Sequence, residues 1–215
     1  MIKNITIDSC IDKILSQLNK HSQIDEKQRI VLTYGTRIII NSVISYSLAL
    51  LLALIIGVFK EVLIILFAVS ILRGFSGGAH NSNIRNCAIN GAIISNLLGL
   101  IVKYFLISKA TLYSFIIVTF FIALWAIGKY APADTPGKPI TTITKRYQLK
   151  RRSFIVLSLW CFMCIYWFLR IPHVSIIIYA STLGILWQSM TLTKNGYKLY
   201  NKVDQILNLL FRRVE

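Results

Sequence analysis

The residues best suited to chemistry lie in one short polar stretch, residues 73–88, between two apolar segments. This stretch contains His80 and Cys87, although the whole chain has only 3 His and 4 Cys residues. A thiol and an imidazole suffice for nucleophilic catalysis, because the imidazole takes the thiol proton and the thiolate attacks a carbonyl carbon. Their spacing alone is weak evidence, since catalytic pairs of unrelated families share no fixed spacing and a lone cysteine is usually a small packing residue. The pair therefore indicates acyl-transfer chemistry only if the fold brings the two side chains together.

The backbone between these two residues must break for the pair to work. In one continuous helix, His80 and Cys87 would lie on the same face but about 10 Å apart, too far for direct proton transfer. Three glycines precede His80 and permit sharp turns. The polar residues that follow are good N-caps, so we expect a helix to begin near Ser82 or Asn83. Cys87 would then lie close to the first turn, where the positive helix end and nearby arginines favour a thiolate.

The rest of the chain has the composition of an integral membrane protein. Hydrophobic residues make up 55% and charged residues 15% of the 215 residues, and the mean hydropathy is +0.64. The apolar residues form long blocks, which predicts an all-α polytopic fold with about six membrane-spanning segments. The block at 62–72 is only half a span, so its helix must continue into the glycine-rich stretch or be re-entrant. The expected segments are residues 38–59, 62–72, 88–107, 112–128, 153–169 and 174–193.

Three parts of the chain follow from this pattern. Residues 1–37 form an amphipathic N-terminal segment, in which apolar residues recur at spacings of three and four, as in an interfacial helix. Residues 38–193 form a membrane-embedded domain that contains the candidate stretch 73–88 and a long basic loop at 129–152. Residues 194–215 form a basic tail with an apolar stripe, which predicts a second interfacial helix.

The charge of the chain is strongly positive, with 24 Lys and Arg against 8 Asp and Glu and a net charge of +16. In a soluble protein this would suggest nucleic acid, but the charges lie between the apolar blocks and no nucleic-acid-binding motif is present. Anionic membrane lipid is the first explanation and an acidic peptide partner the second. Twenty of the Lys and Arg residues lie in the two terminal segments, in 73–88 and in 129–152. The positive-inside rule places all four of these segments in the cytoplasm.

Several groups could support the Cys–His pair, and the sequence does not choose among them. The oxyanion formed in acyl transfer needs donors, such as the amides of Gly77 and Gly78 or those at the start of the helix. One His and one Cys are too few ligands for zinc, so we expect no metal and no cofactor. In the basic loop, Lys145, Arg146 and Lys150 would suit an acidic substrate segment. A third group normally orients the imidazole, and the candidates are Ser76, Asn81, Asn83, Asn86 and Asp134.

Two separated motifs resemble the accessory gene regulator B (AgrB) family. Arg73, Gly78, His80 and Cys87 stand at the spacing of that family's signature, and residues 129–140 look like its second hallmark. The resemblance extends over essentially the whole chain. It implies a membrane cysteine endopeptidase in the cell membrane of a Gram-positive bacterium, where it processes the small pro-peptide AgrD in quorum sensing.

The resemblance also implies roles for individual residues. Cys87 would be the nucleophile that releases the acidic C-terminal tail of the pro-peptide, and His80 its general base. The thioester left on Cys87 would pass to an internal Cys or Ser of the substrate, which closes a thiolactone or lactone ring. Arg73 would bind that tail or brace the loop, and Asp134 would be structural, pairing with Arg73 or a loop lysine. A homodimer is a further expectation, supported by small residues recurring every four positions from Gly91 to Gly99.

Two other functions remain open from the sequence. A small peptide transporter or exporter would explain the number of spans and a broken second span. It would not explain a His and a Cys at the break, and the spans lack acidic coupling residues. A non-catalytic membrane scaffold is the other alternative. Replacement of Cys87 by alanine separates them, because only an endopeptidase should lose its activity.

Overall fold

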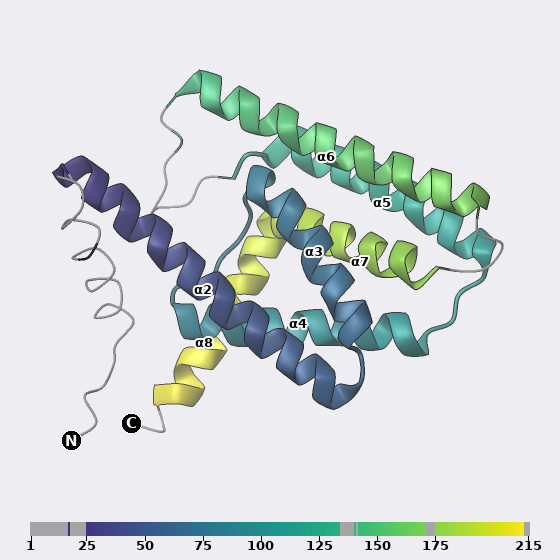
Figure 1. The fold of residues 1–215 in the computed structure, drawn as a ribbon, viewed down its shortest axis with the longest axis horizontal. Helices are drawn as coiled ribbons and strands as arrows, with labels where there is room; N and C mark the ends of the chain where they lie inside the picture. Colours follow the sequence, from purple (N-terminus) through teal and green to yellow (C-terminus); the bar gives the residue numbers. More distant parts are fainter. Residues whose placement is uncertain (1–16, 18–24, 134–139, 141, 171–174, 213–215) are drawn as a thin grey trace.

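All regular structure in the described part of the chain is helical, which confirms the all-α polytopic fold. The computed structural model describes residues 17, 25–133, 140, 142–170 and 175–212. Figure 1 shows α5 and α6 side by side, with α7 and α3 beneath them and α2 and α4 on the opposite side. The helices are α2 (Glu26–Ile56), α3 (Phe59–Ser76), α4 (Ile84–Tyr104), α5 (Lys109–Tyr130), α6 (Ile143–Arg170), α7 (Ile176–Thr191) and α8 (Lys194–Arg212).

The number of clear membrane spans is lower than the sequence predicted. In the described residues, 4 helices are long and apolar enough to cross a membrane: α2, α4, α5 and α6. A fifth span is reached if α7 and α8 are counted as one, but these two helices meet at 88°. We treat α7 as the membrane-embedded half of this pair and α8 as an interfacial helix, because α8 is strongly amphipathic and nearly perpendicular to α7.

The broken segment does not lie where the apolar block at 62–72 suggested. Helix α3 runs without interruption from Phe59 to Ser76, so the block continues into the glycine-rich stretch, one of the two alternatives that the sequence left open. Its 18 residues span about 27 Å. The charged side chains of Lys60, Glu61 and Arg73 near its two ends distinguish it from an ordinary apolar span.

Two helix boundaries differ from those expected. Residues 143–152 were predicted as loop, but they form the first turns of α6, because this basic segment is rich in Leu, Lys, Arg and Gln, all good helix formers. Helix α2 begins at Glu26 and passes residue 37 without a break. The N-terminal interfacial helix predicted within residues 1–37 lies mostly outside the described residues, and its part from Glu26 onward belongs to α2.

Helix α3 is the centre of the bundle, because it contacts α2, α4, α6 and α7. Its buried Leu72 packs with Ile127 of α5, Leu157 of α6 and Ile185 of α7. Where α3 meets α4, a Cβ on Gly99 would lie only 2.7 Å from Val62, so this glycine permits the two helices to pack closely. Gly91, in contrast, has no neighbour within 4 Å of such a Cβ.

Polar contacts gather at the two opposite ends of the bundle. At one end the α2–α3 turn meets the end of α4, where Lys103 Nζ donates to the Gly57 carbonyl at 2.9 Å. At the other end, the segment between α3 and α4 meets residues 131–133 and the α7–α8 junction. The candidate stretch, the start of the basic loop and the C-terminal helix therefore share one end, as their grouping by charge predicted.

Candidate active site

The backbone breaks between α3 and α4, as the sequence predicted. Helix α3 ends at Ser76, and Gly77 and Gly78 follow with φ angles of +69° and +147°, which are unfavourable for other residues. Helix α4 begins at Ile84, and the Asn83 side chain caps it by accepting a hydrogen bond from the Asn86 amide at 2.8 Å. The seven-residue separation between the histidine and the cysteine is thus not spanned by one helix.

This break places the two candidate catalytic residues on different backbone elements. Cys87 is half-buried in the first turn of α4, where its amide donates to the Asn83 carbonyl at 3.1 Å. His80 precedes the helix in the connecting segment, with its side chain open to solvent on one side. Cys87 therefore lies at the positive end of α4, the location expected for a reactive thiol.

The imidazole of His80 is neutral at pH 7. Desolvation by the surrounding protein, and then the positive charge of Arg73, lower its pKa to about 4. A neutral imidazole has a free lone pair and can accept a proton from a thiol.

Arg73 braces the segment that carries His80. Its guanidinium group donates to the carbonyl of Ala79, the residue before His80, and to Gln188 Oε1 of α7 at 3.3 Å. Gln188 is fully buried, and its Nε2 donates to the Gly77 carbonyl at 2.7 Å. The Ala79 amide donates to the Thr191 carbonyl at 3.1 Å. Arg73 and the end of α7 together hold the segment in place.

Gly78 is enclosed by this clamp. A Cβ at this position would lie 2.7 Å from Thr191 Oγ1, 3.3 Å from Gln188 Nε2 and 3.4 Å from the Arg73 guanidinium. The place of Gly78 in the family signature thus has a physical reason in this chain, because any side chain would displace the clamp.

We expect Gly78→Ala to loosen the segment around His80. Backbone strain of about 1–3 kcal/mol adds to the clash, and the unfolding midpoint should fall by roughly 2–10 °C. Gly74→Ala is the matched control, because Gly74 lies within α3 with nothing within 4 Å of the methyl group that alanine would add, and alanine favours a helix. Thermal unfolding of the two variants checks this, and equal midpoints would contradict the assignment of Gly78.

The second motif packs against the first. The Ala133 amide donates to the Ser76 carbonyl at 2.9 Å, and a Cβ on Gly77 would clash with the Ala133 carbonyl oxygen. The Gly77 amide donates to the Arg73 carbonyl at 2.9 Å, so it does not serve as the oxyanion donor that the sequence suggested. Residues 134–139, including Asp134, lie outside the described residues, and the predicted pairing of Asp134 stays a prediction.

Helix α8 contributes polar side chains that the sequence did not single out. The Asp204 carboxylate accepts hydrogen bonds from Asn81 Nδ2 at 3.2 Å, the Ser82 amide at 3.1 Å and Asn86 Nδ2 at 2.8 Å. Partial burial alone would raise the pKa of Asp204, but hydrogen bonds from Ser82, Asn86 and Asn81 lower it, so this carboxylate is ionised at pH 7. Asn208 Oδ1 accepts from Asn86 at 2.8 Å.

Tyr200 of α8 lies between the two halves of the site. Its side chain is buried and its ring packs 6.4 Å from that of Trp187. Burial raises the pKa of the Tyr200 hydroxyl, Arg73 lowers it and Cys87 raises it, so the hydroxyl is within electrostatic reach of both residues and stays protonated at pH 7. Arg73 is likewise within electrostatic reach of His80.

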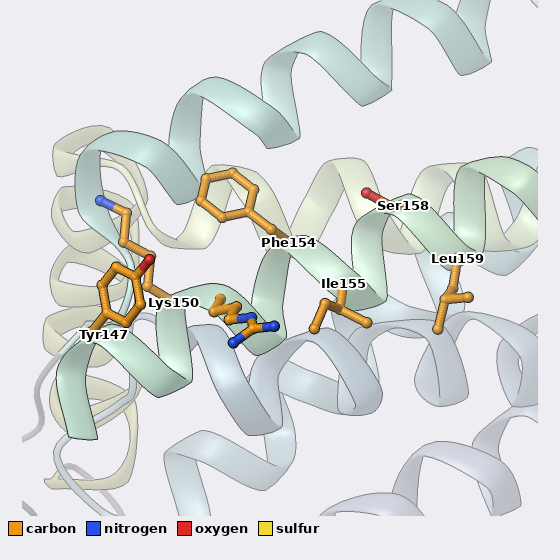
Figure 2. A pocket seen from close by; sticks show the side chains of 7 residues that line it. Tyr147, Lys150, Phe154, Ile155, Ser158 and Leu159 are labelled. Carbon is orange, nitrogen blue, oxygen red and sulfur yellow. The ribbon is translucent and has the colours of Figure 1, made fainter. Parts of the chain in front are cut away.

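The predicted basic residues lie on α6 beside this region. Arg146 Nη1 donates to the Pro132 carbonyl at 3.5 Å, and Lys150 Nζ donates to the Gly128 carbonyl, while Lys145 is exposed. An open groove of about 590 Å³ runs along α6. In Figure 2, Tyr147 and Lys150 lie towards one end of it and Ser158 and Leu159 towards the other. Its lining residues are Tyr147, Lys150, Arg151, Phe154, Ile155, Ser158 and Leu159.

The groups that sequence reasoning missed are Gln188, Thr191, Tyr200 and Asp204. Gln188 is a buried amide in an apolar helix, and Asp204 is the single acidic residue in an otherwise basic and amphipathic helix. Each departs from its local pattern, which is the signal that could have identified it. Among the described residues, no group of three His, Cys, Asp or Glu side chains could hold a metal ion.

Comparisons with known proteins agree with the two motifs. The model of the accessory gene regulator B family matches residues 11–192. The chain is 35% identical to AgrB-like protein 2 of Clostridium perfringens, over 98% of this chain and 100% of that protein. It is 27% identical to accessory gene regulator protein B of Staphylococcus aureus, over 86% of this chain and 93% of that protein. No solved structure matches. The chain belongs to the accessory gene regulator B (AgrB) family.

Proposed function

We propose that this protein is a membrane cysteine endopeptidase of the accessory gene regulator quorum-sensing system. It removes the C-terminal tail of a small pro-peptide and promotes closure of a thiolactone or lactone ring in the remaining signal peptide. The observation that carries this proposal is the break between α3 and α4, which puts a neutral His80 before a helix that holds Cys87 in its first turn. Family membership supplies the substrate class.

The reaction begins with proton transfer and attack. The neutral His80 imidazole takes the proton of the Cys87 thiol, and the sulfur forms a bond with the carbonyl carbon at the end of the signal segment. The tetrahedral intermediate collapses by breaking the carbon–nitrogen bond, and the amine of the departing tail takes the proton from His80. A thioester between the signal segment and Cys87 remains.

Ring closure uses the same two residues in reverse. An internal thiol or hydroxyl of the substrate attacks the thioester carbonyl, His80 takes its proton, and Cys87 leaves as a thiolate that is then reprotonated. The thioester retains much of the acyl-transfer potential of the peptide bond, so exclusion of water favours ring closure over hydrolysis. The clamp of Arg73, Gln188 and Thr191 keeps His80 in place during both steps.

The positive charge at this end of the bundle supports an acidic tail as the leaving segment. Lys145, Arg146 and Lys150 lie on the first turns of α6. Arg146 donates to the Pro132 carbonyl, and the neighbouring Ala133 packs on the active-site segment. We place this end in the cytoplasm of a Gram-positive cell, because 20 of the 24 Lys and Arg residues belong to the two terminal segments, residues 73–88 and residues 129–152, which the positive-inside rule assigns to the cytoplasm. Anionic lipid would hold the same basic surface at the membrane.

A reconstituted cleavage assay tests the proposal. The full chain is placed in vesicles containing anionic lipid and supplied with amphipathic pro-peptides that carry an internal cysteine and either an acidic or a neutral tail. We expect mass spectrometry to detect a released acidic tail and a signal peptide one water lighter than its linear form. Release of the neutral tail should be slower. If neither pro-peptide is cleaved, or if both cross the membrane intact, the endopeptidase proposal fails and an exporter is favoured.

A further inference from the structure

We propose that Asp204 of α8 is a positioning residue that fixes the placement of His80 relative to Cys87. The inference rests on the proposed function, since it concerns the same pair of residues. It assigns a role in the site to the C-terminal helix, which lies beyond residues 11–192, the part that the family model matches.

One carboxylate group binds the residues next to both members of the pair. Asn81 follows His80, and its Nδ2 donates to Asp204 Oδ1 at 3.2 Å. Asn86 precedes Cys87, and its Nδ2 donates to the same oxygen at 2.8 Å. The other oxygen of Asp204 accepts from the Ser82 amide between them at 3.1 Å. One carboxylate, that of Asp204, is therefore hydrogen-bonded to residues on both sides of the backbone break.

The groups around Asp204 determine which kind of side chain can accept these hydrogen bonds. The groups that meet its carboxylate are all donors, namely the amide and hydroxyl of Ser82 and the side-chain amides of Asn81 and Asn86, so an acceptor with two oxygens is required. Asn90 Nδ2 donates to Asn81 Oδ1 at 3.1 Å, which orients the Asn81 amide with its nitrogen towards Asp204. Hydrogen bonds to an ionised acceptor are about twice as strong as neutral ones. The carboxylate is thus better suited to this position than an amide.

Two residues further along α8, Asn208 and Phe211, add contacts on the Cys87 side. Asn208 Oδ1 accepts from Asn83 Nδ2 at 3.3 Å and from Asn86 Nδ2 at 2.8 Å. The Arg85 guanidinium lies 3.9 Å from the centroid of the Phe211 ring. Neither contact reaches the residues next to His80. Among these α8 residues, Asp204 is the one that bridges the break, and its loss should change the His80–Cys87 geometry.

Asp204→Asn is the direct test, and Gln205→Lys is its control. The two substitutions change the net charge by the same amount at adjacent positions of α8, and Gln205 is exposed. We expect Asp204→Asn to lower tail cleavage per folded protein about 100-fold, as a displacement near 1 Å does in other enzymes. Gln205→Lys should stay within about twofold of the unaltered chain. Asp204→Glu should recover part of the activity, because it retains the carboxylate.

A second readout separates positioning from simple stabilisation. The rate at which iodoacetamide alkylates Cys87 is measured against pH by mass spectrometry of the peptide that contains Cys87. We expect the pH profile of Asp204→Asn to move to that of His80→Ala, because in both variants the thiol loses its base. If Asp204 only stabilised the fold, Asp204→Asn would lower the folded fraction of the protein and leave the pH profile of Cys87 alkylation unchanged.

Asn81→Ala keeps the inference testable if Asp204→Asn does not fold. It removes the Asp204 contact next to His80 together with the Asn90–Asn81 hydrogen bond, and leaves the Ser82 and Asn86 contacts of Asp204 in place. We expect a loss of about tenfold and a shift of the profile in the same direction. Asp204→Asn or Asn81→Ala with an unchanged rate and profile would overturn the inference. Cleavage that persists in Cys87→Ser would instead overturn the proposed function, while the alkylation profile would still report on Asp204.

Discussion

Replacing Cys87 with serine should abolish tail cleavage, with a loss of at least about a thousandfold. A serine hydroxyl is a far poorer nucleophile than a thiol unless the whole site is built to activate it, and one removed nucleophile costs nearly as much as the whole catalytic set. The side chain is half-buried in the first turn of α4, so the smaller oxygen atom should not disturb the helix. Initial rates of tail release by mass spectrometry measure the effect.

Cys161→Ser is the matched control for this substitution. Cys161 is also a half-buried free cysteine, but it lies in the membrane-embedded part of α6. We expect this variant to cleave at the rate of the unaltered chain. Equal rates for Cys87→Ser and the unaltered chain would remove Cys87 from the mechanism, and equal losses in both variants would point to a general effect of cysteine replacement.

His80→Ala should lower the cleavage rate about 100- to 10,000-fold, the usual contribution of a general base. Desolvation and then Arg73 lower the pKa of His80 to about 4, so the base is present in its neutral form across the neutral and mildly acidic range. Activity should therefore persist as the pH falls below 6.5, the ordinary midpoint of a histidine, and should be lost only as His80 becomes protonated at lower pH. The pH profile of kcat/KM measures this.

Imidazole added to the buffer supplies the control for this variant. Since one side of His80 is open to solvent, a small base can reach the space left by His80→Ala, and we expect part of the activity to return. Cleavage at the full rate by His80→Ala would contradict the role of His80 as general base. Loss of activity in the unaltered chain near pH 6.5, the ordinary midpoint of histidine, would contradict its lowered pKa.

The parts of the site that local sequence signals encode were predicted correctly. Gly77 and Gly78 require turns, and Asn83 is a good N-cap, so the end of α3 and the start of α4 followed from residues next to one another in the chain. The apolar blocks likewise predicted a helical membrane protein, because every backbone group in a bilayer needs a partner. Charge grouping predicted which connecting segments lie together.

Long-range partners could not be predicted in this way. Gln188 contacts Gly77, 111 positions away, and Asp204 contacts Ser82, 122 positions away. No periodicity specifies such pairs, because they depend on how α7 and α8 turn back over the α3–α4 connection. The start of α6 was also missed, since its basic first turns resemble a loop in composition although their residues favour a helix.

The most direct measurement of the central mechanism is the mass of the acyl-enzyme. A pro-peptide whose internal ring-closing cysteine is replaced by alanine can be cleaved but cannot cyclise, so the thioester should accumulate. After rapid acid quenching and digestion, we expect the signal segment to be attached to the peptide that contains Cys87, and hydroxylamine should release it. Release of the tail with no adduct on Cys87, or with the adduct on another residue, would contradict nucleophilic catalysis by this thiol.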